Sequence, residues 1–236
     1  MCQVSFANGD WDFVMPSKIY ESLKDEYPEK PQPVVESGLQ FVGAAAEQQL
    51  KIESVASKIR FTAEGGHFGV TIGEKVVYVH VIGDYCGWEE FRRRISNAVD
   101  AFIAATGATS VERIGVRYIN RIVLDVGTFP LSKYFTSPPS APVGEFVGIK
   151  TFFQRLEVEF ADSPSTLICT FGTAEESDPT KVAIVLDLDV VRTWTNEEPL
   201  TIAELSQAVE YLRALERDAF ESLITDDLRK RFDDDD

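Results

Sequence analysis

The sequence predicts an α+β protein in which helices pack on one face of an antiparallel sheet. Two observations support this fold class. Apolar residues alternate with a period of two in several segments, and they recur at three-and-four spacing in others. The element order, a three-stranded meander followed by a long helix, occurs twice. We therefore expect a single domain made of two similar halves, residues 39–107 and 146–231, joined by a central strand over residues 111–126.

The chain should begin with a short apolar strand and then a helix over about residues 16–26. Pro16 is typical of the first turn of a helix. Three further prolines, Pro28, Pro31 and Pro33, would end that helix. They predict an extended connector as far as Gly38.

The first half should contain the most secure helix of the chain. Its apolar stripe runs from Trp88 to Ile103, and Gly107 is a typical terminator. Before it, the alternation predicts strands at residues 58–62, 68–72 and 75–82. The last of these is apolar on both faces, which indicates a central position in the sheet.

The second half should repeat this order. Strands are predicted at residues 150–160, 165–171 and 181–191. A helix of about 30 residues should follow, with Thr201 and Glu204 forming a capping box at its start. The acidic tail at residues 233–236 is expected to be disordered.

Composition restricts the classes of function. A net charge of −16 argues against a broad nucleic-acid surface and favours either a basic protein partner or simple solubility. Three cysteines without close pairs indicate reduced thiols and a cytoplasmic location. We see neither a secretion signal nor an apolar run long enough to span a membrane.

Charged side chains of three predicted strands form the candidate site. Alternation places Arg117 and Arg121 on one face of the central strand, whereas Tyr118 and Asn120 lie on the other. If the three strands are neighbours, their arginines and carboxylates merge into one charged face. The candidates for binding a ligand or partner are Arg117, Tyr118, Asn120, Arg121, Arg155, Glu157, Asp187 and Asp189.

Three interpretations of this face remain open. It can be a set of cross-strand ion pairs with a structural role, or a surface that binds a ligand or partner. Asp187 and Asp189 could also hold a divalent metal with Glu157 as a third ligand, but the arginines would compete for these carboxylates. We predict no metal, no cofactor and no catalytic residue. The nearest candidate for a reactive group, Cys86 beside a helix start, could have a lowered pKa but has no histidine or acid partner in the sequence.

Several strings resemble a known family. They are Trp11 to Pro28, Gly87 to Phe91, Arg113 to Ile122, Leu131 to Phe135, Leu186 to Val190, and Phe220 to Phe232. Together they resemble the sporadically distributed family of uncharacterised prokaryotic proteins in the TIGR collection, and Arg117-Tyr118-Ile119-Asn120 is the most specific string. The Asn-Pro-Pro-Ile opening typical of that family is absent, so the N-terminus is expected to be divergent or shortened. The resemblance implies a compact prokaryotic protein and brings no catalytic residues.

Our leading hypothesis is a non-enzymatic binding protein that works through a protein partner or self-association. It could be an acidic partner or antitoxin-like regulator in a prokaryotic defence or mobile-gene context. The alternative is a protein that binds a small molecule or nucleotide, or a metal-dependent enzyme, using the charged sheet face.

Overall fold

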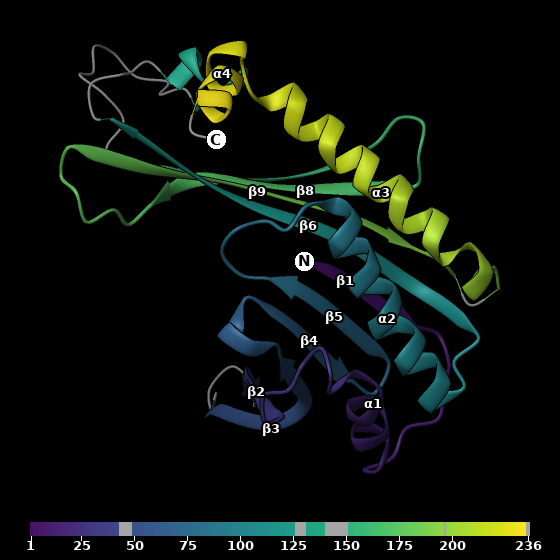
Figure 1. Cartoon of the computed structure of the whole chain (residues 1–236). Coiled ribbons are helices and arrows are strands. Elements are labelled where there is room, and N and C mark those ends of the chain that lie inside the picture. Colours follow the sequence, from purple (N-terminus) through teal and green to yellow (C-terminus); the bar gives the residue numbers. More distant parts are fainter. Residues whose placement is uncertain (43–48, 126–130, 140–150, 196, 235–236) are drawn as a thin grey trace. The chain divides into compact units, whose positions relative to one another are not determined.

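A computed structural model describes residues 1–42, 49–125, 131–139, 151–195 and 197–234 (Figure 1). Within these residues the chain forms ten β-strands of an antiparallel sheet and four α-helices, which confirms the α+β class. The fold divides into two compact units. Unit 1 comprises Met1–Ile114 and Trp194–Ser206, and unit 2 comprises Gly115–Thr193 and Gln207–Asp236.

Unit 1 is a sheet with two helices, α1 (Met15–Leu23) and α2 (Trp88–Thr106). Its strands lie in the order β2-β3-β4-β5-β1-β6, and β10 also pairs with β6. They are β1 (Cys2–Phe6), β2 (Gln32–Val42), β3 (Gln49–Thr62), β4 (Phe68–Gly73), β5 (Val76–Val81), β10 (Leu200–Thr201) and the first residues of β6 (Ser110–Asp125). The predicted central position of β5 is confirmed, because β4 and β1 flank it.

The helix predicted most securely forms as expected. The apolar stripe of α2 is buried, and the ring of Phe102 stacks on that of Phe6 at 4.6 Å. Gly107 ends the helix in the left-handed region, with φ of 67°, and donates its N–H to the carbonyl oxygen of Ile103 at 2.8 Å.

The connector predicted before residue 38 is wrong. Residues from Gln32 onward form β2, which pairs with β3 starting at Gln32 opposite Arg60. Strand β2 lies at the end of the strand order. A proline such as Pro33, which has no N–H to donate, is tolerated on an edge strand. The prolines therefore made this segment resemble a connector in the sequence, although it forms a strand.

Unit 2 is a meander covered by helices on one face. Strands β7 (Phe153–Glu159), β8 (Ser165–Ala174) and β9 (Lys181–Thr193) confirm the three predicted strands and lie in the order β6-β9-β8-β7. Helix α3 (Ile202–Leu223) runs along this sheet, and the short helix α4 (Asp226–Asp234) follows at its C-terminal end (Figure 1). The buried core consists of Ile122, Leu124, Leu131, Tyr134, Phe135, Phe171, Ile184, Leu186, Leu188, Ile224 and Leu228.

The predicted helix of about 30 residues is wrong, because it breaks between α3 and α4. Ile224 forms an isolated bridge with Phe135, and the hydroxyl of Thr225 accepts a hydrogen bond from the N–H of Leu228 at 3.4 Å. Two β-branched residues in succession lower the helix propensity where this contact is available. The Glu204 half of the predicted capping box is confirmed, since the Glu204 carboxylate accepts the Thr201 N–H at 3.2 Å; the Thr201 hydroxyl donates to the same carboxylate at 2.6 Å.

Helix α4 ends at Asp234 and so extends into the acidic tail at residues 233–236. Residues 235–236 lie outside the described residues. No helix in the described part of the chain combines the length and the apolar character needed to cross a membrane.

Candidate functional site

The two faces of the unit 2 sheet differ in character. One face packs against α3 and α4 through the core described above. The other face, which we call the open face, carries the side chains of Arg117, Ile119 and Arg121 on β6, Asp187 and Asp189 on β9, Ile168 and Thr170 on β8, and Phe153, Arg155 and Glu157 on β7. Ile119 is 60% exposed and Phe153 is 75% exposed. Most of the predicted site residues therefore lie on this face.

Arg117 and Asp187 form the tightest ion pair of the open face. Arg117 Nε donates to Asp187 Oδ1 at 2.7 Å, and Nη2 donates to Oδ2 at 2.5 Å. These hydrogen bonds, together with the charge of nearby Asp189, raise the pKa of Arg117 above its usual value. Both Asp187 oxygens are thus occupied by an arginine, which removes this carboxylate from the metal-ligand set considered above.

Arg121 pairs with a loop rather than with the strand carboxylates. Its Nη2 donates to the carbonyl oxygen of Glu175 at 3.1 Å and to the carboxylate of Glu176 at 2.8 Å. The bond from Arg121 lowers the pKa of Glu176. The loop between β8 and β9 is therefore fastened to β6.

Arg155 and Glu157 do not join the lattice that the sequence suggested. They pair with each other at 2.8 Å on β7, and both are exposed. Strands β9 and β8 separate β7 from β6, which places them about 14 Å from Arg117 at the usual strand spacing. The predicted neighbourhood holds for β6 and β9 and is wrong for β7, because the meander inserts β8 between β9 and β7.

Tyr118 and Asn120 lie on the helix-covered face. The Asn120 amide donates to the backbone carbonyl of Leu186 at 3.2 Å. The guanidinium of Arg213 on α3 lies 4.5 Å from the centre of the Tyr118 ring and hydrogen-bonds Glu216. The Tyr118 contact joins α3 to the sheet, whereas the Asn120 bond joins β6 to β9, and both side chains lie away from the open face.

Glu216 is a buried carboxylate that the sequence reading missed. Its residue is 2% exposed, and burial raises its pKa to about 7 although Arg213 favours the charged form. The sequence does indicate that position 216 is buried, because it continues the helical spacing of the buried residues Leu205, Val209 and Leu212.

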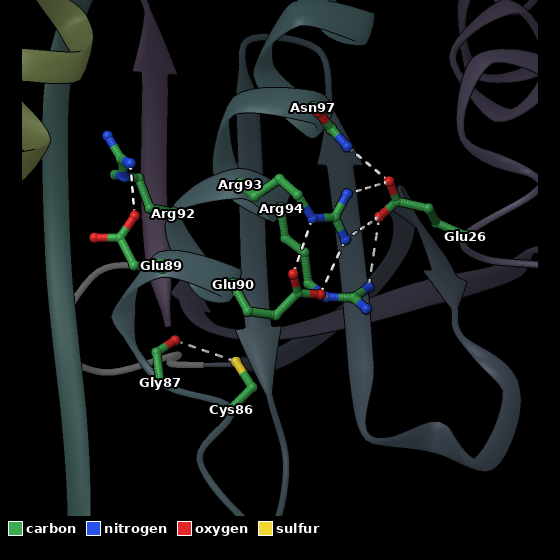
Figure 2. A network of polar contacts seen from close by, with 9 residues as sticks. All are labelled: Glu26, Cys86, Gly87, Glu89, Glu90, Arg92, Arg93, Arg94 and Asn97. Atoms are coloured by element: carbon green, nitrogen blue, oxygen red, sulfur yellow. Dashed lines mark hydrogen bonds and ion pairs between the residues drawn. The ribbon is translucent and has the colours of Figure 1, made fainter.

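A second polar network, also unpredicted, lies in unit 1 (Figure 2). Arg93 bridges Glu90 at 2.9 Å and Glu26 at 2.7 Å, and Asn97 donates to Glu26 at 2.6 Å. The guanidinium of Arg94 lies 3.7 Å from the centre of the Phe68 ring. This network joins the segment after α1 to α2. Its sequence signal is a run of arginines placed three and four residues after glutamates.

The thiol of Cys86, drawn in Figure 2, lies 3.5 Å from the Gly87 carbonyl oxygen. Burial is the main influence on this thiol and raises its pKa, which corrects the lowering considered from the sequence. Burial also lowers the pKa of His80 to about 4, so this ring is neutral near pH 7. Neither group is prepared for acid–base chemistry or nucleophilic attack at neutral pH.

Two of the hollows lined by described residues bear on ligand binding. An apolar pocket of about 60 Å³ lies on the helix-covered side of unit 2, with Leu156, Cys169 and Phe171 in its lining. A shallow polar hollow of about 600 Å³ lies in unit 1, beside Trp11, Lys58 and Lys75. The first is far smaller than the roughly 300–1,000 Å³ of a small-molecule site, whereas the second falls in that range. The described residues contain no group of three or more His, Cys, Asp and Glu placed to hold a metal ion.

Comparisons with protein-family models, with curated proteins and with solved structures found no match. Membership of the resembled prokaryotic family therefore stays a prediction. The functional assignment rests on the geometry of the open face.

Proposed function

We propose that this chain is a non-enzymatic, cytoplasmic binding protein that contacts a basic protein partner through the open face of unit 2. It would act as an acidic partner or antitoxin-like regulator in a prokaryotic defence or mobile-gene context. The observation that supports this most directly is the pairing of charges on the open face. Arg117, Arg121 and Arg155 each have a carboxylate partner, while Ile119 and Phe153 on the same face stay exposed.

This arrangement favours binding over catalysis. Active sites usually hold a titratable group whose pKa is shifted towards the working pH. On the open face the shifts run the other way: the pKa of Arg117 is raised and that of Glu176 is lowered, so both groups stay charged. Exposed apolar side chains within a polar surround are typical of the contact residues of protein interfaces.

The net charge of −16 supports a basic partner. Complementary charge speeds the encounter of two proteins and favours one partner over others more than it raises affinity. Binding should therefore form faster at low ionic strength, with the apolar side chains providing most of the contact energy.

Affinity capture from native lysate tests this function with a matched pair of variants. The wild-type chain should retain a basic protein, and Ile119→Asp should lose it. Phe13→Asp is the control, because Phe13 is also a large exposed apolar residue, at 92% exposure against 60% for Ile119, but lies in unit 1. Equal capture by all three proteins, or capture by none, would reject the proposal.

The hollow in unit 1 supports a second candidate function, the binding of a small molecule. Its lining pairs Lys58 and Lys75 with Glu74 and Glu112 beside the ring of Trp11, which would suit a flat, polar compound. Thermal-shift screening with nucleotides and divalent ions tests it. A ligand at 100 times its dissociation constant should stabilise the protein by about 2.7 kcal/mol, and the absence of any shift would remove this candidate.

A further inference from the structure

Strand β7 is an edge strand with unusual exposure. It is the last strand in the order of unit 2, and all seven of its residues are exposed. Within the described residues no strand pairs with its outer side. Leu156 and Val158, on the helix-covered face, are 47% and 49% exposed. Natural proteins normally protect such edges because they are ready to pair with another strand.

The backbone of β7 shows which groups face outward. Thr173 donates its N–H to the carbonyl oxygen of Phe152, and Phe160 donates its N–H to that of Ser165, both at 3.1 Å. In an antiparallel pair the hydrogen-bonded residues alternate, so even-numbered residues bond to β8. The odd-numbered residues Phe153, Arg155, Glu157 and Glu159 therefore direct their N–H and C=O groups away from β8, towards the free edge.

We propose that β7 pairs with β7 of a second copy of this chain, antiparallel, with the two-fold axis at Leu156. In this register Arg155 lies opposite Glu157 of the second copy, and Glu157 lies opposite Arg155 of the second copy. Leu156 meets its own counterpart, and Val158 meets Gln154 of the second copy. Every facing pair of odd residues can exchange two backbone hydrogen bonds.

Charge selects this register over its neighbours. A two-fold axis at Arg155 would place two arginines opposite each other, and an axis at Glu157 would do the same with two glutamates. Like charges directly opposite are unfavourable. A register shift by one residue would place odd-numbered residues, whose N–H and C=O groups point to the free edge, opposite even-numbered residues, whose groups point to β8. The 2.8 Å contact between Arg155 and Glu157 within one chain shows that both side chains lie on the same face of the strand.

This self-association uses the backbone edge of β7, whereas the capture experiment for the proposed partner changes Ile119 on β6, so the two proposals are tested separately. Self-association should be measured at a salt concentration near 0.15 M, which screens the long-range repulsion of two chains that each carry −16. Sedimentation velocity over a concentration series gives the dissociation constant of the dimer.

Charge-reversal variants make the test specific. Arg155→Glu and Glu157→Arg should each weaken the dimer at least tenfold, because each places like charges opposite each other twice. An equimolar mixture of these two variants should form a heterodimer, because the two substituted positions then face each other with opposite charges. The other facing pair is the native one, Glu157 of the first variant with Arg155 of the second. Arg217→Glu, the same charge change at an exposed site on α3, should leave the dimer unchanged.

Three results would overturn the proposal. They are a wild-type chain that stays monomeric at all concentrations, a dimer that both single reversals leave intact, and a mixture that fails to associate. Thermal melts of each variant would separate loss of pairing from loss of folding. A monomeric wild type would leave capture of the basic partner unaffected, so failure of this proposal is distinguishable from failure of the proposed function.

Discussion

Replacing Arg117 with methionine tests whether the ion pair on the open face stabilises the fold. The change keeps most of the aliphatic chain and removes both hydrogen bonds to Asp187, a residue that is only 8% exposed. Asp187 would then be a nearly buried carboxylate without its arginine partner. Loss of one partner from a fully buried pair costs about 3–5 kcal/mol, while an exposed pair contributes at most about 1 kcal/mol.

The expected cost lies between these limits. The side chain of Arg117 is 36% exposed and that of Asp187 is 12% exposed, so solvent screens one partner more than the other. We predict a loss of about 2 kcal/mol in the free energy of unfolding at pH 7.5. The double variant Arg117→Met with Asp187→Leu should recover part of that loss, because no unpaired charge remains.

Urea unfolding followed by far-UV circular dichroism measures this effect. Tryptophan fluorescence is unsuitable, because Trp11, Trp88 and Trp194 all belong to unit 1. A cost below about 0.5 kcal/mol, or a double variant as unstable as the sum of the single changes, would refute the reasoning.

Three further predictions concern other contacts. The wild-type chain should lose up to about 3 kcal/mol of stability as pH rises from 4.5 to about 7, because the raised pKa of Glu216 makes the folded state hold a proton that the unfolded state releases. Glu216→Gln should flatten this pH dependence of stability. An unchanged slope in pH-dependent urea melts of the variant would contradict the role of Glu216. Gly107→Ala should cost about 1 kcal/mol, since φ is 67° and no atom lies near the added Cβ, so a neutral result in thermal melts would contradict the conformational explanation. Glu26→Gln should speed hydrogen exchange in the segment after α1, because the carboxylate that Arg93 and Asn97 share loses its charge. Unchanged exchange rates would show that the network does not hold this segment.

Local patterns predicted the elements well where burial follows a simple period. The stripe of α2 and the alternation of β5, β8 and β9 gave the correct element types, because each segment buries one face or both. The same rules failed at β2, where Pro33 is accommodated by an edge position that only strand order defines. They also failed at Ile224, where a contact with Phe135, distant in the sequence, interrupts the helix.

The candidate site was predictable in composition and only partly in arrangement. Alternation correctly grouped Arg117 with Arg121 on one face, and Asp187 does meet Arg117. The position of Arg155 and Glu157 depends on which strand lies between β9 and β7, a long-range pairing that side-chain period does not encode. Glu216 is buried at a position that helical spacing predicts, but a carboxylate does not count as part of an apolar stripe, so its burial was not predicted.

Site-specific photo-crosslinking tests the central claim most directly. A photoreactive amino acid placed at position 119, on the open face, is compared in native lysate with the same group at position 13, in unit 1. We predict one discrete adduct with a basic protein from position 119 and no such adduct from position 13. Absence of an adduct at position 119, or the same adducts from both positions, would contradict the account.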